Sequence, residues 1–226
     1  DGITNDQTLV ISGTAEADSI VEVLVGGTSA GTISADGSGN WVFDYTGTPL
    51  NQGSYVLTAT ATDSAGNTSA ASAGFALEID LTAPVAPVVT GVTDDTGTAG
   101  DGITSDQTLI ISGTAEAGAI VDVLVDGGSA GTTTADGSGN WTFDYTGTTL
   151  PEGSYVLTAT ATDGAGNTSA VSASFALVID QTAPAAPTVA GITNDTGTAG
   201  DGITSDQTLI ISGTSEAEAI VDVLVD

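Results

Sequence analysis

The chain repeats itself with a period of 100 residues, and this feature constrains its fold more than any other. The segment DGIT begins at Asp1, Asp101 and Asp201, and residues 1–81 differ from residues 101–181 at 18 positions. Residues 201–226 differ from residues 101–126 only at Ser215 and Glu218. Solenoid repeats usually have about 20 to 50 residues, whereas a period near 100 is typical of whole domains. The sequence therefore predicts a string of similar small domains.

Two proline-rich segments, residues 81–87 (LTAPVAP) and 181–187 (QTAPAAP), mark the predicted boundaries. Proline fixes φ and lacks an N–H donor, so such segments favour extended linkers. We predict a first repeat without its initial strand at residues 1–81, a complete repeat at 82–181, and the N-terminal part of a third at 182–226. The two partial repeats are expected to expose a strand edge and an open core.

Alternating apolar and polar residues inside the complete repeat indicate β-strands. Seven strands are predicted, at residues 88–93, 107–112, 120–125, 130–135, 140–145, 154–162 and 172–179. Trp141, Phe143 and Tyr145 share one strand face, which indicates core positions. Tyr155 follows the turn at Gly153, the pattern of a tyrosine corner. The predicted fold class is all-β, with tandem seven-stranded antiparallel Ig-like β-sandwiches in an extended rod.

The side chains available to this chain exclude several function classes. The sequence has 29 Asp and Glu, no Lys, Arg, His, Cys or Met, and a formal net charge of -29. A polyanion of this kind has no cations for nucleic acid or lipid headgroups, so we expect no nucleic-acid partner and no membrane insertion. Acid–base catalysis would depend on paired carboxylates in an apolar pocket, and no such pattern is evident, so we expect no enzyme. Oxygen-only ligands favour Ca²⁺ first and Mg²⁺ second.

The motifs of the chain resemble the bacterial Ig-like repeats of very large surface adhesins. They read TDDTGTAGDGITSDQTLIISGTAE at 93–116, DGSGNW at 136–141, LTATATDGAGN at 157–167 and IDQTAPAAP at 179–187. The resemblance covers essentially the whole chain. It implies secreted repeats of Gram-negative bacteria that form a stalk at the extracellular bacterial cell surface, often stiffened by calcium.

The strand order predicts where the acidic residues gather. Loops 114–119, 136–139 and 163–167 fall at the end of the sandwich that faces the preceding repeat. Asp80, at the end of the first repeat, is therefore expected to meet Glu116, Asp163 and Asn167. These oxygens suit a Ca²⁺ at the junction. The alternative is that Asp163 and Asn167 belong to a tight turn that bonds its own backbone.

The loop at residues 94–106 predicts a second cation site at the opposite end. It carries four acids, Asp94, Asp95, Asp101 and Asp106, among glycines that permit sharp reversals. The cation would lie within the loop or be shared with Asp180, and the alternative is a solvated acidic loop. The third repeat offers the corresponding candidates Asp195, Asp201 and Glu216.

Three functions are compatible with these patterns. The first is a structural extender, whose partners are the adjacent repeats of the same chain and calcium ions, and which projects a distal adhesive tip of unidentified ligand. The second is an Ig-like module that binds a glycan or protein. The third is a filament-forming surface fibre, because residues 182–200 contain the initial strand that residues 1–81 lack. Near-identical repeats favour the extender, because copies add length rather than distinct recognition.

Overall fold

The computed structural model describes residues 2–193, 196, 198 and 200–225. It divides into two compact units, Asp1–Ile179 and Asp180–Asp226, of which the first contains two tandem sandwiches. No helix occurs in the described residues, and so none that is long and apolar enough to span a membrane.

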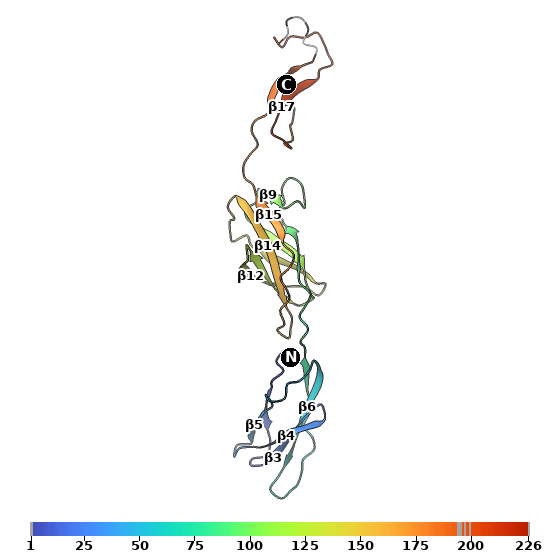
Figure 1. The fold of residues 1–226 in the computed structure, drawn as a ribbon, viewed down its shortest axis with the longest axis vertical. Coiled ribbons are helices and arrows are strands. Elements are labelled where there is room, and N and C mark those ends of the chain that lie inside the picture. The colour runs from blue at the N-terminus through green and yellow to red at the C-terminus, as the bar shows by residue number, and fades with distance from the viewer. Residues whose placement is uncertain (1, 194–195, 197, 199, 226) are drawn as a thin grey trace. The chain divides into compact units, whose positions relative to one another are not determined.

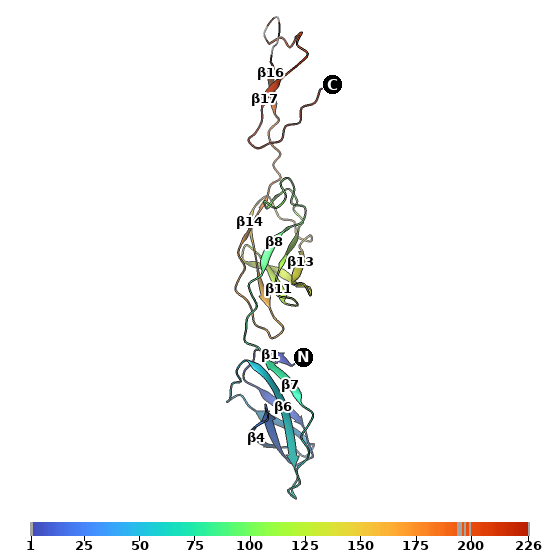
Figure 2. The same cartoon turned by 90° about the vertical axis from the view of Figure 1, so that its right-hand side faces the viewer.

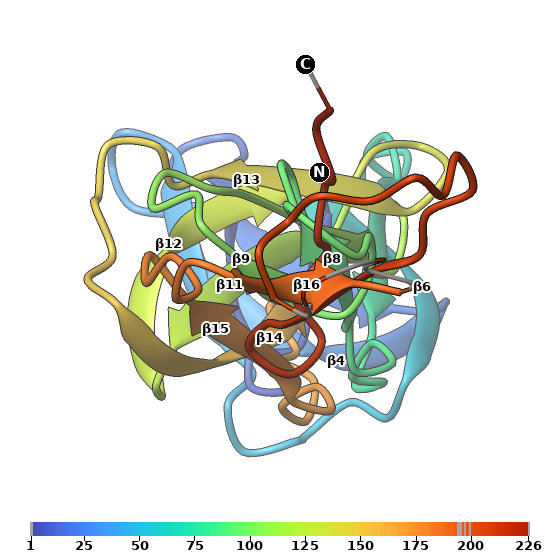
Figure 3. The ribbon, with the colours of Figure 1, turned by 90° about the horizontal axis from the view of Figure 1, so that it is seen from above.

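The sandwich of residues 82–181, called repeat 2, has two sheets (Figure 1). The smaller sheet has the order β13-β10-β8 and the larger has the order β12-β11-β14-β15-β9. Figure 3 separates β13 of the first layer from β14 and β15 of the second. The strands are β8 (Val88–Val92), β9 (Ile103–Thr104), β10 (Ile110–Thr114), β11 (Ile120–Val125), β12 (Gly128–Thr134), β13 (Asn140–Asp144), β14 (Gly153–Thr162) and β15 (Phe175–Ile179).

The sandwich of residues 1–81, called repeat 1, has the same layers but no counterpart of β8. Its larger sheet has the order β1-β7-β6-β3-β4, and its smaller sheet contains only β2 and β5. Figure 2 shows β1 beside β7 at the edge of the larger sheet. The strands are β1 (Ile3–Thr4), β2 (Val10–Thr14), β3 (Ile20–Val25), β4 (Thr28–Ser34), β5 (Asn40–Asp44), β6 (Gly53–Thr62) and β7 (Phe75–Ile79).

The missing strand changes the core. In repeat 2 the buried apolar side chains form one cluster, centred on Trp141, Leu157 and Ile179. In repeat 1 the corresponding residues form two separate clusters, one around Trp41 and one around Ile79. Apolar burial is the main favourable term in folding, so repeat 2 is the better-stabilised of the two.

The second unit contains one antiparallel pair, β16 (Thr188–Ile192) with β17 (Ile211–Thr214). This pair repeats the pairing of β8 with β10, including the register shift in mid-strand. Val189 and Ile210 are exposed here, whereas Val89 is buried in repeat 2.

The structure confirms the Ig-like sandwich and the tyrosine corner. The Tyr155 hydroxyl donates to Pro151 O at 2.9 Å, and the Tyr55 hydroxyl donates to Asn51 O at 3.0 Å. Trp141 is 2 % exposed and Trp41 is 8 % exposed, so both belong to the core as expected.

Several strand boundaries were wrong, for physical reasons. The strand expected at 107–112 begins at Ile110, because Asp106 Oδ1 accepts the Thr108 N–H and holds these residues in a turn. The strand expected at 172–179 begins at Phe175. Before it, Ser172 Oγ replaces a backbone carbonyl by accepting the Ala159 N–H. The strand expected at 130–135 starts earlier, at Gly128, after a tight turn.

An eighth strand was not predicted. β9 contains only two residues and pairs with β15 in parallel, with Ile103 opposite Val178 and Thr104 opposite Ile179. It lies at the end of the loop that had been assigned to an acidic site. Two residues are too few for the alternation pattern to reveal a strand.

Candidate metal centres

Backbone N–H groups take the place of cationic side chains around the carboxylates. Asp136 Oδ1 accepts the Ser138 N–H at 2.8 Å and the Asn140 N–H at 2.9 Å, and Asp36 makes the same contacts in repeat 1. Hydrogen bonds from the backbone of Asn140 and Ser138 hold the pKa of Asp136 below its ordinary value. The chain has no Lys or Arg, so turns of this kind are its main means of stabilising charge.

The β14–β15 loop of repeat 2 contacts repeat 1. Asn167 Nδ2 donates to Asp80 O at 2.9 Å and to Asp163 Oδ2 at 2.9 Å. Beside it, the Asn5 N–H donates to Ala165 O at 3.1 Å. The amide group of Asn167 therefore bridges an oxygen of each repeat, as a small cation would.

The loop at residues 63–67 is the counterpart in repeat 1 and shows the same turn without the contact to a neighbouring repeat. Asn67 Nδ2 donates to Asp63 Oδ2 at 2.7 Å, but the loop is exposed. At Asp163, partial desolvation raises the pKa, but hydrogen bonds from the side chain and backbone of Asn167 outweigh it, so the pKa lies below its ordinary value. At Asp63, hydrogen bonds from the side chain and backbone of Asn67 likewise hold the pKa of the carboxyl below its ordinary value.

The linker between repeats 1 and 2 is packed. Pro84 and Pro87 are buried, whereas Pro184 and Pro187, at the same positions one period later, are exposed. The carboxylate of Asp80 caps this linker, because its Oδ1 accepts the Thr82 N–H at 2.9 Å. The burial of two proline rings restricts the conformations of this linker. The contacts of Asp80 O with Asn167 and of the Asn5 N–H with Ala165 O restrict them further.

The structure thus brings together three of the four residues expected at the junction. Asp80 O and Asp163 Oδ2 both accept a hydrogen bond from Asn167 Nδ2, while the Asp80 carboxylate accepts the Thr82 N–H. Glu116 lies exposed on the β10–β11 loop, where its carbonyl accepts the Ala119 N–H at 3.1 Å. In the second unit, Glu216 is the counterpart of Glu116. Its Oε2 accepts the Ala185 N–H at 3.0 Å and so holds one residue of the linker in place.

The loop at residues 94–106 is organised around Asp95. Its Oδ2 accepts the Gly100 N–H at 2.7 Å and the Gly102 N–H at 3.4 Å. Its Oδ1 is buried and has no hydrogen-bond partner. A buried carboxylate oxygen without a donor is costly, and a cation would relieve that cost.

The other acids of this loop stabilise turns. Asp101 Oδ1 accepts the Ile103 N–H at 2.9 Å, and Asp106 Oδ1 accepts the Thr108 N–H at 2.9 Å. Asp94 has a positive φ of 54° and presents its carbonyl to Thr104 Oγ1 at 2.7 Å.

The candidates of the second unit follow the same pattern. Asp180 Oδ1 accepts the Thr182 N–H, and Asp201 Oδ1 accepts the Ile203 N–H, both at 2.9 Å. Asp195 lies outside the described residues.

Across residues 2–193, 196, 198 and 200–225, no three acidic side chains gather in an arrangement suited to a metal ion. A cation at the junction would therefore depend on backbone carbonyls, the Asn167 side chain and water in addition to one carboxylate. A cation beside Asp95 would depend on backbone carbonyls and water in addition to one or two carboxylates. Ca²⁺ accepts such a mixture because it takes six to eight oxygens in flexible geometry.

Sequence reasoning missed Asn5 and Ala165 at the junction. Both act through backbone atoms, which leave no residue-type signal. Asn5 also differs from its counterparts Ser105 and Ser205, and this difference was the one available hint.

Comparisons with known proteins agree with this architecture. The profile of the bacterial Ig-like domain matches residues 1–81 and 82–181, and the profile of the bacterial Ig-like domain, group 3, matches residues 139–224. No curated protein matches the chain.

Three solved structures illustrate the similarity. Fibronectin(III)-like modules of Clostridium thermocellum CbhA align with a TM-score of 0.46 and 20% identity, over 78% of this chain and 87% of theirs. A 1.5-MDa bacterial ice-binding adhesin aligns with 0.39 and 25%, over 77% and 57%. A tetra-tandem repeat from the extending region of a large adhesion protein aligns with 0.34 and 23%, over 86% and 50%. The chain thus spans little more than half the length of these two adhesin structures. Because the family profile covers two consecutive sandwiches, the chain belongs to the bacterial Ig-like domain family.

Proposed function

We propose that these repeats are the extender of a bacterial cell-surface adhesin, which holds a distal adhesive tip away from the cell and is stiffened by Ca²⁺ at the repeat junctions. The observation that carries the proposal is the packed junction between repeats 1 and 2. Asn167 bridges Asp80 O and Asp163 Oδ2, and the prolines of the linker are buried. A module that served only to bind a ligand would not need a restricted linker.

Calcium fits this junction through a small rearrangement. A half-turn of the Asn167 amide would direct Oδ1 instead of Nδ2 toward the point between Asp80 O and Asp163 Oδ2. A cation at that point would take the place of the two N–H groups of Asn167 Nδ2. Its ligands would be Asp80 O, Asp163 Oδ2 and Asn167 Oδ1, and water would complete the coordination. Asp95, with its unpartnered buried Oδ1, is the centre of the second proposed site.

The test is a calcium titration of the whole chain with matched variants. Thermal melts in CaCl₂, MgCl₂ and EDTA should separate, with Ca²⁺ stabilising by about 2.7 kcal/mol at a concentration of 100 times Kd. Asp163→Ala should remove the part of this shift that belongs to the junction, whereas Asp63→Ala, in the exposed loop of repeat 1, should not. Asp95→Ala reports on the second site in the same way.

Equal melts in all three conditions would refute the calcium mechanism. The extender would then depend on linker packing alone. An equal loss of the calcium shift in Asp63→Ala and Asp163→Ala would move the metal away from the junction.

A further inference from the structure

An asparagine followed two residues later by serine or threonine is the acceptor sequence for sugars linked to nitrogen. Four such sequences occur in the chain, at Asn67, Asn140, Asn167 and Asn194. A sequence this short arises easily by chance in a chain rich in threonine, so the surroundings of each asparagine decide whether a sugar can be attached. The first three lie in described parts of the structure, whereas Asn194 lies outside the described residues.

Transfer of a sugar to a folded domain needs two accessible side chains. The amide nitrogen of the asparagine is the atom that bonds to the sugar, and the hydroxyl two residues later belongs to the sequence that the transferring enzyme recognises. Both must lie on the surface, because the attached glycan is bulky and polar.

The sequence at Asn167 has neither group accessible. Asn167 Nδ2 donates to Asp80 O and to Asp163 Oδ2, both at 2.9 Å. Two residues later, the Ser169 hydroxyl accepts the Ala161 N–H at 2.9 Å. Ser169 is also buried, so this sequence is closed to an enzyme.

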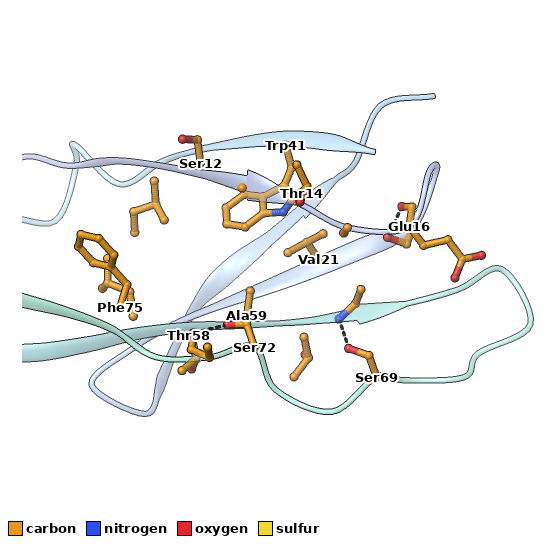
Figure 4. A pocket seen from close by; sticks show the side chains of 18 of the residues that line it. Ser12, Thr14, Glu16, Val21, Trp41, Thr58, Ala59, Ser69, Ser72 and Phe75 are labelled. Carbon is orange, nitrogen blue, oxygen red and sulfur yellow. Dashed lines mark hydrogen bonds between the residues drawn. The ribbon is translucent and has the colours of Figure 1, made fainter. Parts of the chain in front are cut away.

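The sequence at Asn67 lies on the surface, but both of its groups are engaged. Asn67 Nδ2 donates to Asp63 Oδ2 at 2.7 Å. Figure 4 shows Ser69 turned toward β6, where its Oγ accepts the Ala61 N–H at 3.0 Å. The same hydroxyl donates to Ala70 O at 2.9 Å, so its proton is held within the chain.

The sequence at Asn140 is accessible. Asn140, Trp141 and Thr142 are the first three residues of β13, and Trp141 is buried while its two neighbours are exposed. Side chains two residues apart on a strand point to the same face, so the Asn140 amide and the Thr142 hydroxyl share the outer face of the smaller sheet. In the described part of the chain, the side-chain hydrogen bond at Thr142 reaches its carbonyl, from Thr133 Oγ1 at 2.8 Å, and leaves its hydroxyl exposed.

The turn before β13 fixes the backbone of Asn140 but holds its side chain only weakly. The Asn140 N–H donates to Asp136 Oδ1 at 2.9 Å, and the Asn140 carbonyl accepts the Asp136 N–H at 2.8 Å. The side-chain amide lies beside the same carboxylate, and the matching contact of repeat 1, from Asn40 Nδ2 to Asp36 Oδ2, measures 3.5 Å. A hydrogen bond of this length is weak, so the amide can turn outward at little cost.

Repeat 1 has the same local structure without the acceptor sequence. Asn40 begins β5 as Asn140 begins β13. Val42 takes the place of Thr142 and is 59 % exposed. The two repeats therefore differ in the recognised hydroxyl, while the asparagine, its turn and its strand stay the same.

We propose that Asn140 is the acceptor of an N-linked sugar, which is supplied by a glycosyl diphosphate. Asn140 Nδ2 forms a bond to the anomeric carbon of the sugar, and the bond from that carbon to the phosphate oxygen breaks. The diphosphate leaves with the electron pair of this bond, and the amide loses one proton. A glycan at this position would cover the start of β13, an edge strand of the smaller sheet, and so hinder pairing of that edge with another chain.

Mass spectrometry of the whole chain from the cells that produce it tests the proposal. Cleavage at acidic residues places Asn67, Asn140 and Asn167 on different peptides. We expect a sugar on the Asn140 peptide and unmodified peptides for the other two. A single monosaccharide would identify a nucleotide-linked donor, and an assembled oligosaccharide would identify a lipid-linked donor. An unmodified Asn140 overturns the proposal.

Two exchanges between the repeats test the acceptor sequence in the same cells. Thr142→Val should remove the sugar from Asn140 and leave the fold intact, because valine already occupies this exposed position in repeat 1. Val42→Thr should create a second modified site at Asn40. A sugar that stays on Asn140 in Thr142→Val would refute the assigned sequence.

The purified chain, a soluble N-glycosyltransferase and UDP-glucose test accessibility alone. The folded chain should accept glucose at Asn140 and not at Asn67 or Asn167. Synthetic peptides that span the three sequences have no fold and serve as the control, so all three should accept glucose. Equal transfer to the three asparagines of the folded chain would overturn the choice of Asn140.

Discussion

The contact between Asn167 and Asp80 can be tested by substitution, because Asn67 occupies the same position in repeat 1 and serves as the control. Asn167→Ala removes two side-chain hydrogen bonds, to Asp80 O and to Asp163 Oδ2, whereas Asn67→Ala removes only the bond to Asp63 Oδ2. In both loops the backbone N–H of the asparagine donates to the Oδ1 of the aspartate four residues earlier, and neither substitution removes this bond. The difference between the variants is therefore the one hydrogen bond that crosses the junction, worth about 0.5 to 1.5 kcal/mol.

Amide hydrogen exchange at Asn5 measures this difference directly. The Asn5 N–H is bonded to Ala165 O, on the same loop as Asn167, so it exchanges when the junction opens. A loss of about 1 kcal/mol corresponds to roughly fivefold faster exchange at Asn5 in Asn167→Ala. Exchange in the centre of β14 should be unchanged, and Asn67→Ala should leave Asn5 as it is.

Unchanged protection of Asn5 in Asn167→Ala would refute the reasoning, because it would mean that water replaces the amide without loss. Equal acceleration in both variants would also refute it, since Asn67 has no contact with the neighbouring repeat through its side chain.

Three further predictions concern the sandwiches themselves. Leu157→Ala should destabilise repeat 2 by about 2 to 5 kcal/mol, because Leu157 is fully buried, and Leu57→Ala should destabilise repeat 1 by about half as much, because Leu57 is only half-buried. Denaturation followed by fluorotryptophan NMR separates the two repeats, since each contains one Trp, and equal losses would contradict the difference in burial. Gly113→Ala should destabilise repeat 2 by about 1 to 3 kcal/mol or more, because the new methyl group would overlap Val88 O and the Trp141 ring. Gly13→Ala should cost repeat 1 less, because the methyl group would overlap only the Trp41 ring. Similar losses of melting temperature in the two variants would contradict the close approach of β8 to Gly113. Asp136→Ala should destabilise repeat 2 near pH 7, and the penalty should become smaller as the pH falls. Hydrogen bonds from the backbone of Asn140 and Ser138 lower the pKa of Asp136, and the stability that this shift contributes is present above the unfolded pKa and is lost as the pH falls through the folded pKa. A penalty that does not change with pH would show that the charge is irrelevant.

The fold was largely readable from the sequence because periodicity and turn chemistry agree. The strand at residues 120–125 has the bounds expected from alternation alone, and the Gly153–Tyr155 spacing correctly indicated the tyrosine corner. Two of the errors arose where a side chain substitutes for the backbone. Asp106 and Ser172 both satisfy backbone N–H groups and so displace the start of a strand.

The candidate site was readable only in part. Strand order was enough to predict that Asp80 approaches the loop at residues 163–167, and the structure brings them together. The sequence could not indicate that Asp80 contributes its carbonyl, nor that its carboxylate caps Thr82. Such choices depend on backbone direction within one turn, which residue type does not encode. The calcium ion itself stays a prediction.

The parallel pairing of β9 with β15 determines how a repeat responds to tension. β9 follows β8 in the chain and lies beside the last residues of β15, the final strand of repeat 2, and the Val178 N–H donates to Gly102 O at 2.8 Å between them. Because the strands are parallel, a pull that reaches β9 from its N-terminal side and β15 from its C-terminal side slides one past the other along their length. The hydrogen bonds between them then carry the load together and must fail together, instead of opening one at a time as in a hairpin pulled apart at its ends. In repeat 1 the Glu78 N–H donates to Gly2 O at 2.7 Å and the Asp80 N–H donates to Thr4 O at 3.0 Å in the same arrangement. The parallel pairs β1–β7 and β9–β15 thus each form a short mechanical clamp that needs no metal.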